Sequence, residues 1–144
     1  MNIAPVSDDE LAQQCSDKLH SMDECAQTLN ISIDYVKAGQ AKLSMVVDQR
    51  YANGFGHCQG GIITTLADTA FAHACNSYNK VTVAQGLSIE FVRPAKVGDT
   101  LTATAIEVSR GRVTGVYKTK VFNSHNNLVA LFVGKSYELD NSIL

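Results

Sequence analysis

Apolar residues recur at helical spacing near the start of the chain. They lie three or four residues apart, which is the spacing of one face of an α-helix: Leu11, Cys15, Leu19, Met22 and Ala26. Ser7 is a suitable N-cap, because Glu10 stands three residues later and completes a capping box. Asn30 is a suitable stop. The pattern therefore predicts one helix over residues 7–29.

The pattern then changes to that of β-strands. Residues 31–36 and 41–47 form two strand candidates, joined by a turn over residues 37–40 that contains Gly39. A glycine-rich loop over residues 48–59 separates them from a second helical stretch. After residue 80 the period is two, with turn residues at short intervals. It predicts four consecutive strands that neighbour each other as a meander: 83–92, 100–109, 113–123 and 128–138.

The second helical stretch, residues 60–76, carries almost no charge. Between Tyr51 and Asn79 the only acidic or basic residue, histidines aside, is Asp68. A surface helix carries charged residues on its outer face. Here the residues expected on that face are Thr64, Thr65, Ala72 and Cys75. We therefore expect this helix to be covered on every side, and a carboxylate buried there is costly unless it is hydrogen-bonded or has a function.

These elements predict a single α+β domain over residues 1–144. A curved antiparallel sheet of five or six strands would wrap around the uncharged helix, with the N-terminal helix as an additional element. Such a sheet covers one side of the helix and part of its flanks. The remaining flank has no charge, so a second chain is expected to cover it. The predicted active unit is at least a homodimer.

Composition narrows the classes of partner. The 144 residues carry a formal net charge of −2 and no dense cluster of Lys or Arg, which argues against nucleic acid. No apolar run is long enough to cross a bilayer, and the polar N-terminus does not resemble a secretory signal. The four cysteines form no CxxC pair, which favours free thiols in the cytoplasm. No metal is expected, because His57 and Cys58 alone are too few ligands.

Gly60 and Gly61 open the uncharged helix. The first turn of a helix presents unpaired N–H groups at the positive end of its dipole, and glycine lets a substrate oxygen come close to them. This geometry suits an oxyanion hole. Asp68 follows Gly60 by eight residues, about 12 Å along the axis. It could serve a carbonyl held at the helix start of an antiparallel neighbour, so a catalytic site built from both features would be shared by two subunits.

Three motifs carry a family resemblance. CQGG-x4-LADTAFAHACNSY, with Asn53 before it and FVRP-x3-GDTLTATA after it, resembles the hotdog-fold acyl-CoA thioesterases. Within them the chain is most similar to the phenylacetic-acid-degradation thioesterases. The similarity extends from about Leu11 to Tyr137, and the order of elements agrees with the one predicted above.

The resemblance implies a hotdog fold and roles for particular residues. Asp68 would be the nucleophile or general base, and the N–H of Gly60 would polarise the thioester carbonyl. Asn53 would orient substrate or water, and Thr69 would hydrogen-bond near the attacking water. The resemblance also implies a homotetramer, an aromatic acyl group, and no metal or redox cofactor. Basic residues near strand ends would meet the CoA phosphates: Arg93, Arg110, Arg112 and Lys135.

One position departs from the family motif. The usual sequence is His-Gly-Gly, and here Gln59 stands first. A glutamine can orient the thioester through hydrogen bonds, but it cannot exchange a proton near neutral pH. His57, two residues earlier, is a candidate substitute. Cys58 offers a rival mechanism, because a thiol at a helix N-terminus can become a nucleophilic thiolate.

Two other functions remain open from the sequence. The chain could be a non-catalytic acyl-CoA binding protein, although binding alone gives no reason for a carboxylate at Asp68. It could also be a hotdog enoyl-CoA hydratase, although that class prefers an Asp–His pair and Gln59 replaces the histidine. Release of free thiol from acyl-CoA substrates distinguishes the three possibilities.

Overall fold

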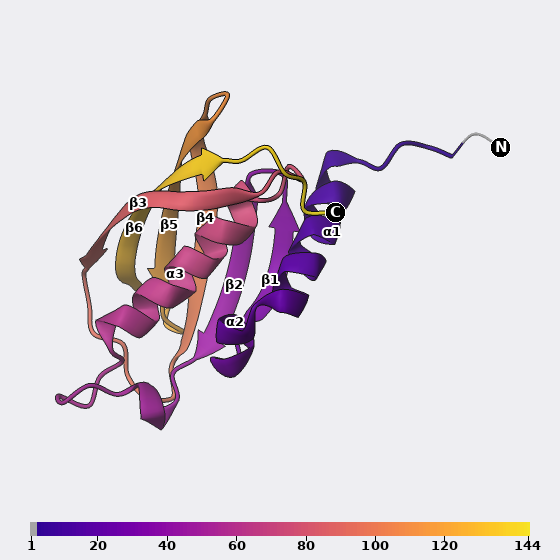
Figure 1. Ribbon diagram of the computed structural model, residues 1–144. Coiled ribbons are helices and arrows are strands. Elements are labelled where there is room, and N and C mark those ends of the chain that lie inside the picture. Colours follow the sequence, from indigo (N-terminus) through magenta and orange to yellow (C-terminus); the bar gives the residue numbers. More distant parts are fainter. Residues whose placement is uncertain (1–2) are drawn as a thin grey trace.

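The computed structural model describes residues 3–144, so the first two residues of the predicted domain lie outside the described part. Residues 3–144 contain three α-helices, one short 3-10 helix and six strands (Figure 1). The helices are α1 (Asp8–Met22), α2 (Glu24–Thr28) and α3 (Gly60–Cys75), and the 3-10 helix is Gln49–Tyr51. The strands are β1 (Ser32–Lys37), β2 (Gln40–Val46), β3 (Thr82–Phe91), β4 (Thr100–Arg110), β5 (Thr114–Phe122) and β6 (Leu128–Glu138).

The six strands form one antiparallel sheet in the order β1-β2-β4-β5-β6-β3. Strands β4, β5 and β6 are the predicted meander, but β3 is not part of it. It pairs with β6 at the far edge, and β2 takes the place beside β4. The loop over residues 92–99 therefore crosses from one side of the sheet to the other. Turn residues in the sequence mark where a strand ends, but not which strand it pairs with, so that part of the prediction is wrong.

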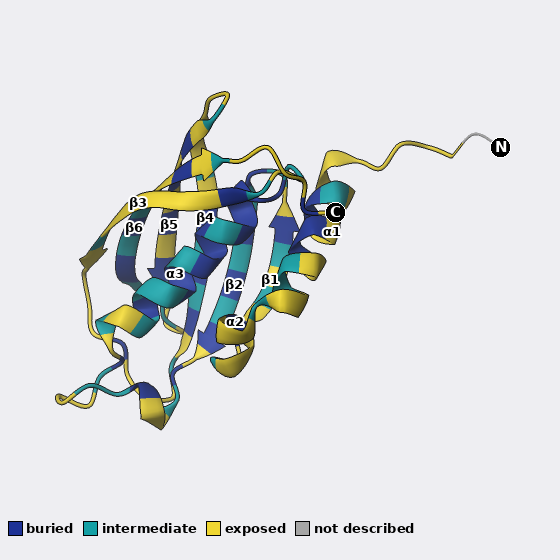
Figure 2. Ribbon diagram, in the orientation of Figure 1, coloured by how far each residue is buried: buried dark blue, intermediate teal, exposed yellow. Residues whose placement is uncertain are grey.

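Helix α3 lies across the concave face of the sheet, with its buried side against β2, β4 and β5 (Figures 1 and 2). Its inner side chains are almost wholly inaccessible, and they include Leu66, Ala70 and Phe71. The rings of Tyr117 and Phe132 pack around Phe71, with centroids 5.5 and 5.7 Å away. This is the hotdog arrangement that the resemblance implies, with α1 outside the wrapped helix.

One flank of α3 is not covered within a single chain. Thr64, Thr65, Asp68 and Ala72 are half-buried there, so the expected cover on every side is not supplied by one chain. Cys75 was expected on this outer flank, but it is 3% exposed and faces the core. It stands seven residues after Asp68, and the last turn of α3 is enclosed on more sides than the first. The open flank therefore extends along α3 as far as Ala72 and stops before Cys75.

The N-terminal helix is interrupted, which differs from the single helix predicted over residues 7–29. The capping box is present, because the Ser7 hydroxyl accepts from the Glu10 N–H and the Glu10 carboxylate accepts from the Ser7 N–H. Asp23 leaves the helical conformation and caps α2 by accepting from the Ala26 N–H at 3.0 Å. An aspartate that caps a new helix competes with continuation of the old one. Within residues 3–144, no helix is long and apolar enough to span a membrane.

Candidate active site

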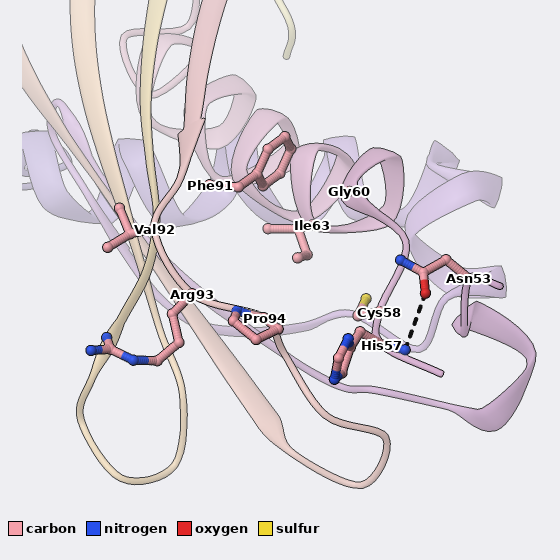
Figure 3. Close-up of a pocket in the computed structure, with 9 residues that line it drawn as sticks. All are labelled: Asn53, His57, Cys58, Gly60, Ile63, Phe91, Val92, Arg93 and Pro94. Atoms are coloured by element: carbon pink, nitrogen blue, oxygen red, sulfur yellow. Dashed lines mark hydrogen bonds between the residues drawn. The ribbon is translucent and has the colours of Figure 1, made fainter. Parts of the chain in front are cut away.

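The loop before α3 is held by Asn53. Its side-chain oxygen accepts from the backbone N–H groups of Phe55 (2.9 Å) and His57 (3.2 Å). The backbone N–H of Asn53 donates to the His57 carbonyl at 2.7 Å. Gly56 has φ +80° in the same loop, a conformation that favours glycine. Because the Asn53 oxygen is already bonded, only its side-chain nitrogen remains for a substrate. That nitrogen lies on the side of the start of α3 (Figure 3).

A cavity of about 270 Å³ lies beside the start of α3 (Figure 3). Its apolar wall consists of Ile63, Phe91, Val92 and Pro94. The remaining residues that line it are Asn53, His57, Cys58, Gly60 and Arg93. The tertiary structure thus joins the loop before α3, the first turn of α3 and the end of β3. Three residues predicted for the site, Asn53, Gly60 and Arg93, meet here.

The first turn of α3 offers free hydrogen-bond donors to this cavity. The Gln59 carbonyl accepts from the N–H groups of Ile62 and Ile63. The N–H groups of Gly60 and Gly61 have no acceptor among residues 3–144. They stand at the positive end of the helix dipole, where a developing negative charge is stabilised. This arrangement suits the oxyanion hole predicted from the glycine pair.

Phe91 covers the first glycine of the helix. A Cβ placed on Gly60 would lie 3.0 Å from the Cζ of Phe91, closer than such contacts normally come. Phe91 as a whole residue is nevertheless 52% exposed, and β3 is an edge strand. Sequence reasoning assigned Phe91 no role in the site. In the sequence, Phe91 is marked only as an aromatic residue at the end of a predicted strand. The pairing of β3 with β6 is what places it over α3.

Asp68 lies on the open flank of α3 and is not among the residues that line the cavity. Its carboxylate is half-buried and makes no hydrogen bond or ion pair with any part of the chain from residue 3 onward. Desolvation by burial raises the pKa of Asp68 above the ordinary value of an aspartate. A carboxylate in this state is a stronger base than a solvated one, and it retains all its hydrogen-bonding capacity for a ligand.

Thr69 is buried on α3, whereas Gln59 is exposed just before it. The Thr69 hydroxyl is buried and donates to the Thr65 carbonyl one turn earlier at 2.7 Å, so it remains an acceptor for a water molecule. The Gln59 side chain is exposed and makes no capping hydrogen bond. It is not among the residues that line the cavity. Neither residue meets Gly60 in the cavity of a single chain.

Cys58 lines the cavity, yet its surroundings do not favour a thiolate. The side chain is 4% exposed, and desolvation by burial raises the pKa of Cys58 to about 11. Its sulfur lies 3.7 Å from the Gln59 carbonyl, a geometry in which the protonated thiol donates. A thiol with a raised pKa is a poor nucleophile near neutral pH. The electrostatics therefore favour Asp68 over Cys58 as the reacting group.

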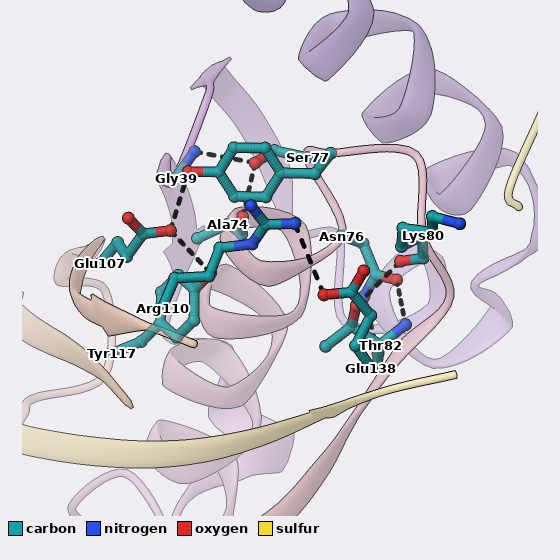
Figure 4. Close-up of polar contacts among 11 residues, drawn as sticks. Gly39, Ala74, Asn76, Ser77, Lys80, Thr82, Glu107, Arg110, Tyr117 and Glu138 are labelled. Carbon is teal, nitrogen blue, oxygen red and sulfur yellow. Dashed lines mark hydrogen bonds and ion pairs between the residues drawn. The ribbon is translucent and has the colours of Figure 1, made fainter. Parts of the chain in front are cut away.

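The opposite end of α3 carries a network of paired polar groups (Figure 4). One oxygen of Glu107 accepts from the hydroxyls of Tyr78 (2.8 Å) and Tyr117 (3.1 Å). Desolvation and then the hydrogen bond to Glu107 raise the pKa of Tyr78 to about 12. Arg110 stacks on the Tyr78 ring at 3.7 Å and lies 3.4 Å from a Glu138 carboxylate oxygen. In one chain, Arg110 therefore lies at the end of α3 remote from Gly60.

Arg112 follows in the exposed β4–β5 turn, while Arg93 lies at the cavity. One guanidinium nitrogen of Arg93 donates to the Leu128 carbonyl at 2.7 Å. Lys135 is exposed on β6. The basic residues predicted for the CoA phosphates are thus split between the two ends of one chain, with Arg93 at the start of α3 and Arg110 and Arg112 beyond its end.

His73 is a core residue, as its position on α3 suggests. Its ring is 2% exposed, and the Nδ1 atom lies 2.8 Å from the Ser16 hydroxyl oxygen of α1. Desolvation, and next the neighbouring His20, lower the pKa of His73 to about 4. The pair fastens α1 to α3.

The family of the chain follows from comparison with known proteins. Residues 55–130, more than half of the chain, match the Thioesterase superfamily. This segment includes all of α3, β3, β4 and β5. The chain belongs to this superfamily, and the predictions of a hotdog fold and of a thioester hydrolase are confirmed.

A particular relative is similar over nearly its whole length. The acyl-coenzyme A thioesterase PaaI of Escherichia coli K12 is 42% identical over 132 residues, which are 92% of this chain and 94% of the relative. The structure of the E. coli PaaI protein, from the phenylacetic acid degradation operon, superposes with a TM-score of 0.93. That comparison has 41% identity and covers 94% of this chain and 99% of the other.

A more distant structure contains a ligand. The smu.793 protein from Streptococcus mutans, bound to acetyl CoA, has a TM-score of 0.76 at 26% identity. The alignment covers 78% of this chain and 91% of the other. The same fold therefore binds an acyl-CoA in a related protein.

Proposed function

We propose that this protein hydrolyses acyl-CoA thioesters to a free acid and CoA. The observation that carries the proposal is the Asp68 carboxylate, which is half-buried, unpartnered among residues 3–144 and raised in pKa. A structural aspartate in such a place would be hydrogen-bonded or paired. The free N–H group of Gly60 complements it, because it can stabilise the oxyanion that forms when the thioester carbonyl is attacked.

Asp68 has two roles open to it in this reaction. As a nucleophile it attacks the carbonyl carbon, expels the CoA thiolate and forms an anhydride that water then hydrolyses. As a general base it removes a proton from the attacking water, and the thiolate leaves with a proton. Thr69 accepts a hydrogen bond from that water, and the free nitrogen of Asn53 orients the substrate.

The site is shared between two copies of the chain. Asp68 is about two helical turns, on the order of 12 Å, from Gly60 on the same helix, so one chain does not bring them to one carbonyl. An antiparallel neighbour does, if it covers the open flank of α3. The free edge of β3 extends this surface, with exposed Val83, Leu87 and Phe91. A homodimer is the minimal unit, and a homotetramer of two dimers is expected from the family resemblance.

The substrate has a long CoA arm and an acyl group. Arg93 is placed to meet a phosphate at the cavity of one chain, while Arg110 and Arg112 would act from the other chain of the pair. Gly61 lets the substrate approach the helix start closely. The apolar wall formed by Ile63, Phe91, Val92 and Pro94 suits an apolar acyl group. The similarity to the E. coli protein favours an aromatic, phenylacetyl-type group.

Residues 1–144 form one thioesterase domain in this proposal. The four cysteines are free, with Cys25 exposed, which favours the reducing cytoplasm as the place of action.

Release of free thiol from a panel of acyl-CoAs tests the function directly. Phenylacetyl-CoA, benzoyl-CoA, acetyl-CoA and a long-chain acyl-CoA are the substrates to compare, and light scattering in the same buffer gives the oligomeric state. Turnover by a dimer or larger assembly is expected. Tight acyl-CoA binding without thiol release would make the protein a binding protein. Hydration of an enoyl-CoA without thiol release would make it a hydratase. A fully active monomer would contradict the shared site.

A further inference from the structure

We propose that His57, rather than Gln59, is the side chain of this loop that contacts the thioester beside Gly60. The inference rests on the proposed function and names one more substrate-contacting residue for it. His57 is half-buried and lines the same cavity as Gly60, whereas Gln59 is exposed and is not among the lining residues. The ring of His57 stands beside Cys58 and Pro94 in this cavity (Figure 3).

The backbone of His57 is fixed before any substrate arrives. Its N–H and carbonyl are both bonded to Asn53, and an antiparallel bridge pairs it with Lys96 of the β3–β4 loop. Two segments far apart in the sequence therefore hold this one residue. A side chain on a fixed backbone loses less freedom when it binds, which is the advantage of a preorganised contact.

The polar groups around the cavity leave few donors for a substrate. The Asn53 oxygen is bonded within its loop, one Arg93 nitrogen is bonded to Leu128, and the Cys58 thiol points to the Gln59 carbonyl. The ring nitrogens of His57 have no hydrogen-bond partner among residues 3–144. A neutral imidazole has one N–H donor and one acceptor. His57 can thus donate to the thioester oxygen next to the free N–H of Gly60, without proton transfer.

Direct contact is tested by NMR of the histidine side chains in the intact protein. The chain has 4 histidines, and single His→Gln variants assign their ring signals. The probe is a ketone analogue of phenylacetyl-CoA with a methylene group between the sulfur and the carbonyl carbon, which keeps the carbonyl oxygen but has no thioester bond to hydrolyse. We expect the His57 ring signals to shift saturably with the analogue, while those of exposed His125 on the β5–β6 turn stay in place. Saturable binding that leaves the His57 ring unmoved would overturn the inference but not the proposed function.

Kinetics gives the second readout. His57→Ala should lower kcat/KM by about threefold to tenfold, the effect of one lost hydrogen bond, and His57→Gln, which keeps an N–H donor, should lose less. His125→Gln removes an imidazole outside the cavity and should match the parent. Gln59→Ala should cost less than His57→Ala, and the reverse order in folded variants would contradict the inference. An unaltered protein that neither binds the analogue nor releases thiol would contradict both proposals.

Discussion

The polar groups at the two ends of α3 differ in whether they have hydrogen-bond partners within the chain. At the start, the N–H groups of Gly60 and Gly61 and the carboxylate of Asp68, two turns along, have no partner in residues 3–144. Beyond the end, the polar side chains of Tyr78, Glu107 and Arg110 are paired with one another or with neighbours. Unpaired groups reduce stability but are available to a ligand. Paired groups fasten the helix to the sheet, so the chemistry belongs at the first end and the anchorage at the second.

The largest expected effect is on activity, at the unpaired end. Asp68→Asn keeps the shape of the side chain but removes the nucleophile or base, so kcat should fall by about 10²- to 10⁴-fold. The same variant should be more stable than the parent at neutral pH. The raised pKa of Asp68 means that its ionised form is disfavoured by folding, and the amide removes that cost. Thiol release and urea unfolding measure the two effects.

An active and less stable Asp68→Asn protein would make Asp68 a structural residue. In the parent, activity should rise with pH as Asp68 ionises, and this rise should lie above the ordinary pKa of an aspartate.

Lowering the pH should destabilise the last turn of α3, where His73 lies, before it affects the start of the helix. The unfolded chain takes up a proton on His73 near its ordinary pKa of 6.5, whereas the folded chain does so only near pH 4. The stability that the neutral ring contributes is therefore complete above pH 6.5 and is lost as the pH falls toward 4. The loss amounts to up to about 3 kcal/mol. Urea unfolding at several pH values measures it, and His73→Gln should show a smaller dependence on pH in this range. An equal dependence in both proteins would assign the effect to other groups.

A smaller loss of stability is expected from the paired network itself. Glu107→Ala leaves the hydroxyls of Tyr78 and of the buried Tyr117 without their acceptor, which should cost about 1–3 kcal/mol. Glu107→Gln keeps an oxygen at the same place and serves as the matched control. Thermal unfolding measures both variants. The difference between the ends of α3 predicts that kcat of the folded Glu107→Ala protein stays close to that of the parent. A large drop in kcat would show that the two ends act together.

The smallest effect is expected at Cys58. Since its pKa is raised to about 11, the thiol stays protonated at neutral pH and Cys58→Ser should keep most of the activity. Thiol release by the variant is measured beside its circular dichroism spectrum. An inactive but folded Cys58→Ser protein, together with an active Asp68→Asn protein, would move the nucleophile to the start of α3.

Local patterns in the sequence were enough for the elements and for the best candidate residue. Helical spacing and an absence of charge predicted α3, and period two predicted β3, β4, β5 and β6. The Ser7–Glu10 capping box is present as expected. Asp68 was identifiable because a single carboxylate in an uncharged helix is conspicuous in any structure. All of these are local features of the sequence. Local sequence determines which segments form helices or strands and which of their faces are polar.

Long-range pairing decided the rest. The place of β3 beside β6 brings Phe91 over Gly60, and no pattern within β3 specifies its partner strand. The break at Asp23 depends on whether its side chain caps the next turn or stays in solvent. The choice between His57 and Gln59 depends on which side chain faces the cavity, because both follow the same loop. The sequence determined which groups are available for chemistry, while the tertiary structure determined which of them meet, since contacts between distant segments arise only from packing.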